Sequence, residues 1–158
     1  MDENAIAGYE IIQAYLRHVD VLAPLFDEYR VFYGQPPNPT SSRNFLAARI
    51  RHQDSVVFAA VNDHEIFDEA YGFTMLYPSY NSRDATPIWI LNDLFVHPSA
   101  RGHGIAKALV DRGKRLAEDT GAKHLTLETG VDNKPSHELY ESAGFRRDDR
   151  YCTFVIDL

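Results

Sequence analysis

The stretch "LFVHPSARGHGIAKALV", residues 94–110, places the end of an apolar run, a turn with two glycines and the start of a helical pattern in direct succession. The first N–H groups of a helix have no partner within the helix. Gly102 and Gly104 carry no side chain, so a ligand can come close to the backbone of this turn. Arg101 adds a planar cationic donor beside it. The stretch therefore predicts an anion site, and a phosphate or pyrophosphate fits it best.

Taken alone, this glycine pattern is explained equally well by a tight turn that binds nothing. It also differs from two phosphate-binding motifs. The Gly-Lys-Ser/Thr sequence of a P-loop does not follow, and the third glycine of the dinucleotide fingerprint is missing. The assignment of a ligand therefore depends on the rest of the chain.

On both sides of this stretch, strand and helix patterns predict a mixed α/β (α+β) fold. Apolar and β-branched runs predict strands at residues 9–15, 55–61, 70–78, 87–98, 123–130 and 150–158. Helical spacing predicts helices at residues 21–33, capped by Asp20, at 43–53, capped within Thr40–Ser42, at 102–120 and at 134–144. The second and third strands form a hairpin, and the helices between the later strands favour parallel crossovers. We expect one central sheet.

Size, charge and composition restrict the class of protein. A chain of 158 residues has the usual length of one domain, so we expect a single domain over residues 1–158. The net charge of −7 argues against nucleic-acid binding. It would favour encounter with a cationic substrate, although solubility alone is the more common reason for such a charge. No apolar run is long enough for a membrane span, and the acidic start lacks the plan of a signal peptide. Cys152, the one cysteine, is expected in the core of the last strand, and we expect a cytoplasmic protein.

Two motifs in the second half of the chain resemble those of the GNAT (GCN5-related) N-acetyltransferases. "RGHGIA" fits the family signature R/Q-x-x-G-x-G/A, with Arg101, Gly104 and Ala106 at the three signature positions. "LETGVDNKPSHELYESAGF", residues 127–145, is similar to the second conserved region of the family. "LNDLFV" and "YRVFYGQ" resemble the subgroup of histone, polyamine and amino-acid acetyltransferases. The resemblance implies a twisted, mostly antiparallel sheet with splayed central strands, flanked by about four helices.

The resemblance implies acetyl-CoA as the acetyl donor and no metal. The pyrophosphate would bind backbone N–H groups of the signature turn, the pantetheine arm would lie along the long strand, and an asparagine would hydrogen-bond the cofactor. These cofactor-binding residues are Leu94, Phe95, Val96, Arg101, Gly102, His103, Gly104, Ile105, Ala106 and Asn133. The seven histidines show no spacing typical of metal ligands.

The family chemistry joins an amine to an acetyl group and releases CoA. Tyr140 matches the general acid that protonates the departing thiolate. Relatives often carry a glutamate where this chain has Asn92, and an amide cannot act as a base. Asp93 or Glu128 could take the proton, directly or through water, and an ordered water relay without a single base is the alternative. Asp93 could also be a purely structural, hydrogen-bonded carboxylate.

Aromatic and acidic side chains are expected around the acceptor amine. The candidates are Tyr29, Tyr33, Trp89 and Glu128 beside Asp93, because aromatic rings and a carboxylate suit an alkylammonium, although core packing explains such aromatics equally well. The favoured acceptor is a small amine, a polyamine or an amino acid, acetylated in a ternary complex. A protein lysine or N-terminus is the rival substrate, and a non-catalytic acyl-CoA sensor is the rival class. The family often dimerises, and an exposed final strand would be a natural pairing edge for a homodimer.

Overall fold

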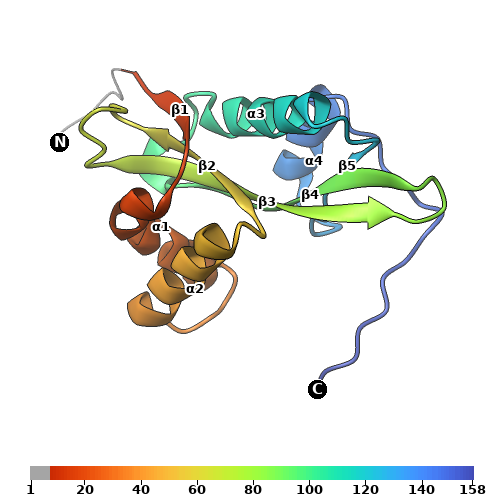
Figure 1. Ribbon diagram of the computed structural model, residues 1–158, viewed down its shortest axis with the longest axis horizontal. Coiled ribbons are helices and arrows are strands. Elements are labelled where there is room, and N and C mark those ends of the chain that lie inside the picture. The colour runs from red at the N-terminus through yellow and green to blue at the C-terminus, as the bar shows by residue number, and fades with distance from the viewer. Residues whose placement is uncertain (1–7) are drawn as a thin grey trace. The chain divides into compact units, whose positions relative to one another are not determined.

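One sheet with the strand order β1-β2-β3-β4-β5 organises the first part of the chain in the computed structural model, which describes residues 8–158 (Figure 1). The strands are β1 (Glu10–Gln13), β2 (Val56–Val61), β3 (Ala70–Asn81), β4 (Thr86–Val96) and β5 (Leu125–Thr126). Neighbouring strands run antiparallel from β1 to β4, whereas β4 and β5 are parallel. The chain divides into two units, of which the first ends at Glu128 and the second is Thr129–Leu158.

Helices cover both faces of the sheet in the first unit. α1 (Val19–Phe32), which follows the short 3-10 helix η1 (Leu16–His18), and α2 (Pro39–His52) pack against each other on one face. α3 (Ile105–Asp119), which follows η2 (Pro98–Ala100), lies on the other face (Figure 1). α3 also supplies the crossover between β4 and β5, which confirms the predicted parallel connection. The mixed, mostly antiparallel sheet agrees with the expected fold.

The main core lies between the sheet and the α1–α2 pair. Phe26 of α1 packs on Phe73 of β3 with ring centroids 5.6 Å apart, and Leu46 of α2 is fully buried beside them. On the opposite face, Leu76 and Leu91 lie against Gly113 of α3. Burying apolar side chains on both faces of the central strands is what holds β3 and β4 in place.

A β-bulge at Asn92 changes which side chains of β4 face each layer. Leu91 pairs with Leu76, and Asp93 pairs with Met75, so Asn92 is the extra residue in β4. Leu91 therefore faces α3, while Asp93 faces the α1–α2 side together with Met75. Without the bulge, residues two apart in a strand would share one face.

Several sequence-based boundaries differ from the structure. α2 begins at Pro39 and is capped by Asn38, whose side chain accepts the Ser41 N–H at 3.0 Å, so the expected cap within Thr40–Ser42 is wrong. His18, not Asp20, is the cap of α1. An Asn-Pro pair combines a capping side chain with the residue best suited to the first helical position, which explains the earlier start.

The expected last strand is not formed. Residues 151–158 belong to no helix or strand in the described part of the chain, and Cys152 is exposed instead of buried. The alternating pattern of these residues predicts a strand, but a strand also needs a partner to accept its backbone hydrogen bonds. β5 is likewise shorter than the predicted 123–130, because its pairing with β4 is limited to Leu125 and Thr126.

The second unit contains α4 (Lys134–Ser142), which confirms the predicted helix at 134–144 to within two residues. Asn133 is its cap and accepts the Ser136 N–H at 3.4 Å. Tyr140 packs edge-to-face on Phe145, with ring centroids 5.9 Å apart. Among the helices described between residues 8 and 158, none has the length and apolar character to cross a membrane.

Candidate active site

The turn before α3 has the geometry of an anion-binding loop. Gly102 and Gly104 have φ angles of 82° and 77°, in the left-handed region that glycine adopts without strain. Gly104 is the cap residue of α3 and offers no side chain to the first N–H groups of the helix, which therefore remain available to a ligand. No heavy atom beyond the neighbouring residues lies within 4 Å of the position that a Cβ of Gly102 would occupy, so this side of the loop is open. The helix dipole adds partial positive charge at the same place.

Side chains of the loop support its shape. The Arg101 Nε donates to the carbonyl of Val96 at 3.2 Å, and its guanidinium carbon lies 5.9 Å from the ring centroid of Phe32 in α1. The His103 imidazole bonds back to the carbonyl of Arg101 at 2.9 Å, so it stabilises the turn itself. His97, which precedes η2, lies 3.4 Å from the Glu28 carboxylate of α1. The Arg101–Phe32 and His97–Glu28 contacts therefore connect the end of α1 to the loop. No sequence pattern predicted this connection.

One edge of β4 is open beside this loop. β4 pairs with β3 along its whole length, but with β5 only at Trp89 and Ile90. From Leu91 to Val96, which includes Leu94 and Phe95, the second edge carries no strand of the described sheet. An open edge offers a row of backbone donors and acceptors to an extended ligand with amide groups.

Asp93 is the buried carboxylate of the site. Only 6% of it is exposed, and it accepts a hydrogen bond of 2.5 Å from the Tyr29 hydroxyl of α1. The Asn92 amide lies 3.2 Å from both carboxylate oxygens of Asp93. The bulge therefore has two consequences, since it turns Asp93 toward α1 and leaves Asn92 free to act as a donor to it. The sequence showed Asn92 and Asp93 only as two polar residues inside an apolar strand.

Burial is the largest cause of the raised pKa values of Asp93 and Tyr29. Removal from water raises the pKa of Asp93 above its usual range, and the hydrogen bonds from Tyr29 and Asn92 oppose that effect. The pKa of Tyr29 is raised by burial first and then by its bond to Asp93, so Tyr29 stays a neutral donor. Burial and the Asp93 charge raise the pKa of the neighbouring Tyr77 to about 12. Of these three side chains, Asp93 is therefore the one that ionises most readily.

The structure brings together some of the predicted acceptor residues and separates others. Tyr33 packs edge-to-face on Tyr29, with ring centroids 5.0 Å apart, and is 61% exposed, so it lies at the rim of the Asp93 cluster. Trp89 is held elsewhere, because its indole N–H donates at 2.8 Å to Thr120 at the end of α3. Trp89 therefore belongs to the α3 side of the sheet, opposite to Tyr29. Glu128 is an exposed residue that follows β5.

Tyr140 and Asn133 lie in the second unit. Tyr140 is partly buried on α4, and Asn133 already serves as the cap of that helix. In residues 8–158 no group of three or more His, Cys, Asp or Glu side chains has an arrangement that could hold a metal ion.

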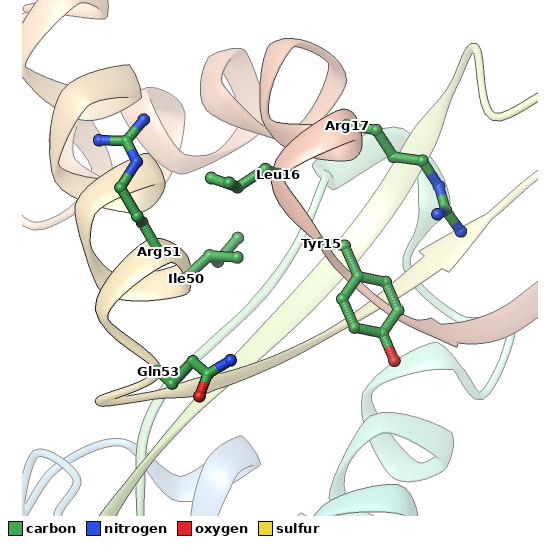
Figure 2. Close-up of a pocket in the computed structure, with 6 residues that line it drawn as sticks. All are labelled: Tyr15, Leu16, Arg17, Ile50, Arg51 and Gln53. Carbon is green, nitrogen blue, oxygen red and sulfur yellow. The ribbon is translucent and has the colours of Figure 1, made fainter.

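A separate cavity of about 390 Å³ lies between η1 and the end of α2 (Figure 2). Leu16 and Ile50 point toward each other across it, and Arg17 and Arg51 lie on its two sides (Figure 2). Tyr15 and Gln53 complete its lining. None of the predicted site residues lines this cavity, so it is distinct from the Asp93 cluster.

Known proteins resemble this chain over most of its length. Residues 22–145 match the Acetyltransferase (GNAT) family. YhfO, an uncharacterized N-acetyltransferase of Bacillus subtilis, is 37% identical over 94% of this chain and 97% of its own length. A probable acetyltransferase of Haemophilus influenzae is 32% identical over 89% of this chain and 92% of its own length. The crystal structure of a probable acetyltransferase, 42% identical, superimposes with a TM-score of 0.87 and covers 94% of this chain and 97% of that one.

The matched region contains the glycine loop, the strand β4 with its open edge and the Asp93 cluster, and the protein is an acyltransferase that acts on nitrogen. The chain belongs to the GNAT family of N-acetyltransferases, whose members use acetyl-CoA.

Proposed function

We propose that the enzyme transfers the acetyl group of acetyl-CoA to the primary amine of a small molecule, a polyamine or an amino acid. One observation carries this proposal. Asp93 is a buried carboxylate of raised pKa at the point where β4 loses its second strand partner. A proton acceptor beside an open strand edge is what attack by an amine on a bound thioester requires.

The glycine loop and the open edge fit the two polar parts of CoA. The backbone of residues 102–106 would hold the pyrophosphate, and the free edge of β4 at Leu94–Val96 would pair with the pantetheine arm. Arg101 would support the loop through Val96 and Phe32, while Asn133 of the second unit would complete the cofactor contacts. When bound, acetyl-CoA supplies an activated acetyl group.

Proton transfer would be divided between two residues. Asp93 would take the proton from the attacking amine, because its raised pKa makes it a stronger base than an ordinary carboxylate. Tyr29 and Asn92 would fix the orientation of Asp93. Tyr140 would donate a proton to the departing sulfur. Glu128 or a water relay remains the alternative route for the amine proton.

A small cationic acceptor suits the surroundings of Asp93. Tyr29 and Tyr33 offer aromatic rings next to one buried carboxylate, an arrangement that binds an alkylammonium by charge and cation–π contact. The net charge of −7 favours the approach of a cation. Direct attack in a ternary complex agrees with this arrangement, because no cysteine or serine nucleophile belongs to the cluster described here. We propose that the enzyme works as a homodimer in the cytoplasm.

Thiol release from acetyl-CoA across diamines, polyamines, amino acids and lysine peptides tests the proposal. Wild type, Asp93→Asn and Tyr140→Phe are compared, with Tyr71→Phe as the matched tyrosine control, since the Tyr71 hydroxyl bonds only to exposed Glu69. We expect turnover with one class of small amines and a loss of about 100-fold in each of the first two variants. Turnover confined to peptides would favour the rival substrate. Activity that survives both substitutions would show that Asp93 is not the base and Tyr140 is not the acid.

A further inference from the structure

Buried polar atoms without a partner gather at one place in the first unit. Within residues 8–158, four buried side-chain nitrogen and oxygen atoms have no hydrogen-bond partner, and they belong to Arg49, Asp54, Ser55 and Thr86. Three of the four lie at the end of α2 and in the short link that leads to β2. A buried donor or acceptor without a partner costs free energy, so a cluster of them is a candidate for the binding of a further molecule.

Arg49 and Asp54 form the charged part of this cluster. A terminal guanidinium nitrogen of Arg49 lies 2.9 Å from the Asp54 Oδ2. The Arg49 Nε and the Asp54 Oδ1 are the atoms without a partner, so the ion pair satisfies only part of each group. The two side chains are 31% and 41% exposed, and the pair therefore reaches the surface. It presents a cationic donor and an anionic acceptor side by side.

The cluster lies on the same face of the sheet as Asp93. Alternation along β2 places Ser55 on the face that carries the core beneath α1 and α2, and Tyr77 of β3 packs against that core. Burial raises the pKa of Tyr77, and the charge of Asp93 raises it further. The charges of Arg49 and Asp54 act on the same pKa in opposite directions. Tyr77 is therefore close enough to the ion pair and to Asp93 to respond to both.

A row of aromatic rings connects the two places above the sheet. Tyr29, which donates to Asp93, lies with its ring centroid 5.8 Å from that of Phe26. Phe26 stacks on Phe45 at 5.7 Å, and the guanidinium carbon of Arg49 lies 5.4 Å from the centroid of Phe45. Phe45 is 43% exposed. The row therefore offers an apolar surface for methylene groups between Asp93 and Arg49.

The separation of the two places sets the length of a molecule that contacts both. Val57 pairs with Met75, and Met75 pairs with Asp93, so Ser55 lies two strands across and two residues along from Asp93. Strand spacings of about 4.8 Å and a rise of about 3.4 Å per residue give a separation of about 12 Å. A head group, about four methylene groups and a terminal amine span this separation when each end forms a hydrogen bond.

A zwitterionic head group matches both members of the ion pair. A carboxylate alone suits Arg49 but is repelled by Asp54. An ammonium group alone suits Asp54 but leaves the Arg49 donors without a new acceptor. The α-carboxylate and α-ammonium groups of an amino acid supply both partners, and hydrogen bonds between charged groups are the strong ones.

We propose that Arg49 and Asp54 bind the α-carboxylate and the α-ammonium group of an α,ω-diamino acid, whose side-chain amine reaches Asp93 and is acetylated there. This inference rests on the proposed function and narrows its acceptor to one class. The C–N bond forms at the side-chain nitrogen while the thioester C–S bond breaks, and the proton lost by that nitrogen leaves with the CoA thiol. Arg49 and Asp54 bind the head group and take no part in proton transfer.

Three acceptors of matched length test the head group. Lysine carries both groups of the head, cadaverine lacks the carboxylate, and aminocaproate lacks the α-amine. We expect kcat/KM for lysine to exceed that for either analogue by at least about tenfold. Mass spectrometry should locate the acetyl group on the side-chain nitrogen of lysine. Equal kcat/KM for lysine and cadaverine would overturn the inference and would leave the proposed transfer to small amines intact.

Substitutions of the ion pair should change the preference between these acceptors. In Arg49→Gln we expect the ratio of kcat/KM for lysine to that for cadaverine to fall by at least about tenfold. Asp54→Asn should lower the ratio of lysine to aminocaproate in the same way. Both acceptors are measured on one preparation, so a smaller folded fraction does not alter either ratio. Ratios that stay at the wild-type value would mean that the pair only supports the fold, and would overturn the inference.

Arg51→Gln is the matched control for Arg49→Gln. Arg51 belongs to the same helix, but it lines the separate cavity beside η1 (Figure 2). We expect the ratio of lysine to cadaverine in this variant to equal that of wild type. An equal fall in both variants would point to the charge of the helix end as a whole and would contradict a specific role of Arg49.

Calorimetry distinguishes a failure of this inference from a failure of the proposed function. Lysine is titrated into the protein saturated with CoA, which carries no acetyl group to transfer. We expect a Kd of about 1 mM or below, and binding at least about tenfold weaker in Arg49→Gln. Lysine binding without turnover of any acceptor would contradict the proposed function and support the head-group site. An absence of lysine binding would overturn the inference, whatever the turnover of other amines.

Discussion

At Asp93, burial and hydrogen bonding act on the carboxyl pKa in opposite directions. Burial raises it, and the Tyr29 hydroxyl lowers it again. Tyr29→Phe should therefore raise the pKa of Asp93 further. The base form of Asp93 would then appear only at higher pH, and the acidic limb of the profile of kcat/KM should move upward.

Tyr77→Phe is the control for this shift. Tyr77 lies in the same layer but donates its hydroxyl to the Met75 sulfur at 3.1 Å and not to Asp93. We expect the acidic limb of the kcat/KM profile of Tyr77→Phe to coincide with that of wild type. Profiles of kcat/KM measured between about pH 4 and 9 test this expectation, because a carboxyl group of raised pKa titrates in this range. A Tyr29→Phe profile that coincides with wild type would mean that Asp93 is not the titrating base.

Among the helical elements, α3 has left-handed glycines at both ends. Gly104 begins the helix with a φ of 77°, and Gly121 follows it with a φ of 68°. A Cβ at either position meets no crowded neighbour, so alanine costs about 1–2 kcal/mol through backbone strain alone. We expect Gly104→Ala and Gly121→Ala to lose similar stability. Only Gly104→Ala should also raise the KM for acetyl-CoA, by several-fold, because it alone narrows the anion loop.

Chemical denaturation and initial rates separate the two effects. Equal stability losses with a KM change confined to Gly104→Ala would support the loop as the cofactor site. An unchanged KM in both variants would show that the loop is a plain tight turn.

The α1–α2 pair depends on one buried carboxylate, Asp27. Its Oδ1 accepts bonds from the Ser42 hydroxyl, the Arg30 guanidinium and the Asn38 N–H, at 2.5, 2.9 and 3.0 Å. Asp27→Ala should destabilise the protein by about 3 kcal/mol, because these donors lose a charged partner. Asp20→Ala is the control, since the Asp20–Arg43 pair is exposed. We expect it to lower the free energy of unfolding by less than about 0.5 kcal/mol. Equal losses in the two variants would contradict this role.

The same carboxylate predicts a pH dependence of stability. The Ser42 bond is the largest cause that holds the pKa of Asp27 below its usual range in the folded protein. A depressed folded-state pKa stabilises the protein above the unfolded pKa, near 4, and this contribution disappears as the pH falls through the folded value. Wild type should therefore lose more stability than Asp27→Ala below about pH 4 in urea titrations.

At the scale of the whole molecule, the proposed homodimer would make stability depend on protein concentration. A dimer that unfolds to two chains is stabilised by mass action. For wild type we expect the melting midpoint to rise by about 2 °C for each tenfold increase in concentration. A wild-type midpoint that is independent of concentration would contradict the homodimer.

The sequence predicted most helices and strands of this molecule. It did not predict the contacts between residues that lie far apart in the chain. Helical spacing located α1 to α4 because one buried face imposes a period on the chain. The Tyr29–Asp93 bond joins residues 64 positions apart, and no local pattern encodes it. The placement of Trp89 on the α3 side follows from its bond to Thr120, which is equally non-local. The segment 151–158 has the composition of a strand, but composition does not supply the neighbouring strand that its backbone hydrogen bonds need.

The extra residue in β4 has a consequence for any alanine scan along this strand. Up to Leu91, alanine at every second position should weaken packing on α3. After Asn92 the alternation of side chains between the two faces is shifted by one residue. Alanine at positions 93 and 95 should therefore affect the acceptor side, and alanine at positions 94 and 96 the α3 side. Deleting Asn92 would make Leu91 and Asp93 neighbours on opposite faces, so Asp93 would still face the acceptor side, but it would lose the amide that lies 3.2 Å from both its carboxylate oxygens. The deletion should therefore act on catalysis through the lost donor and not through a misdirected carboxylate.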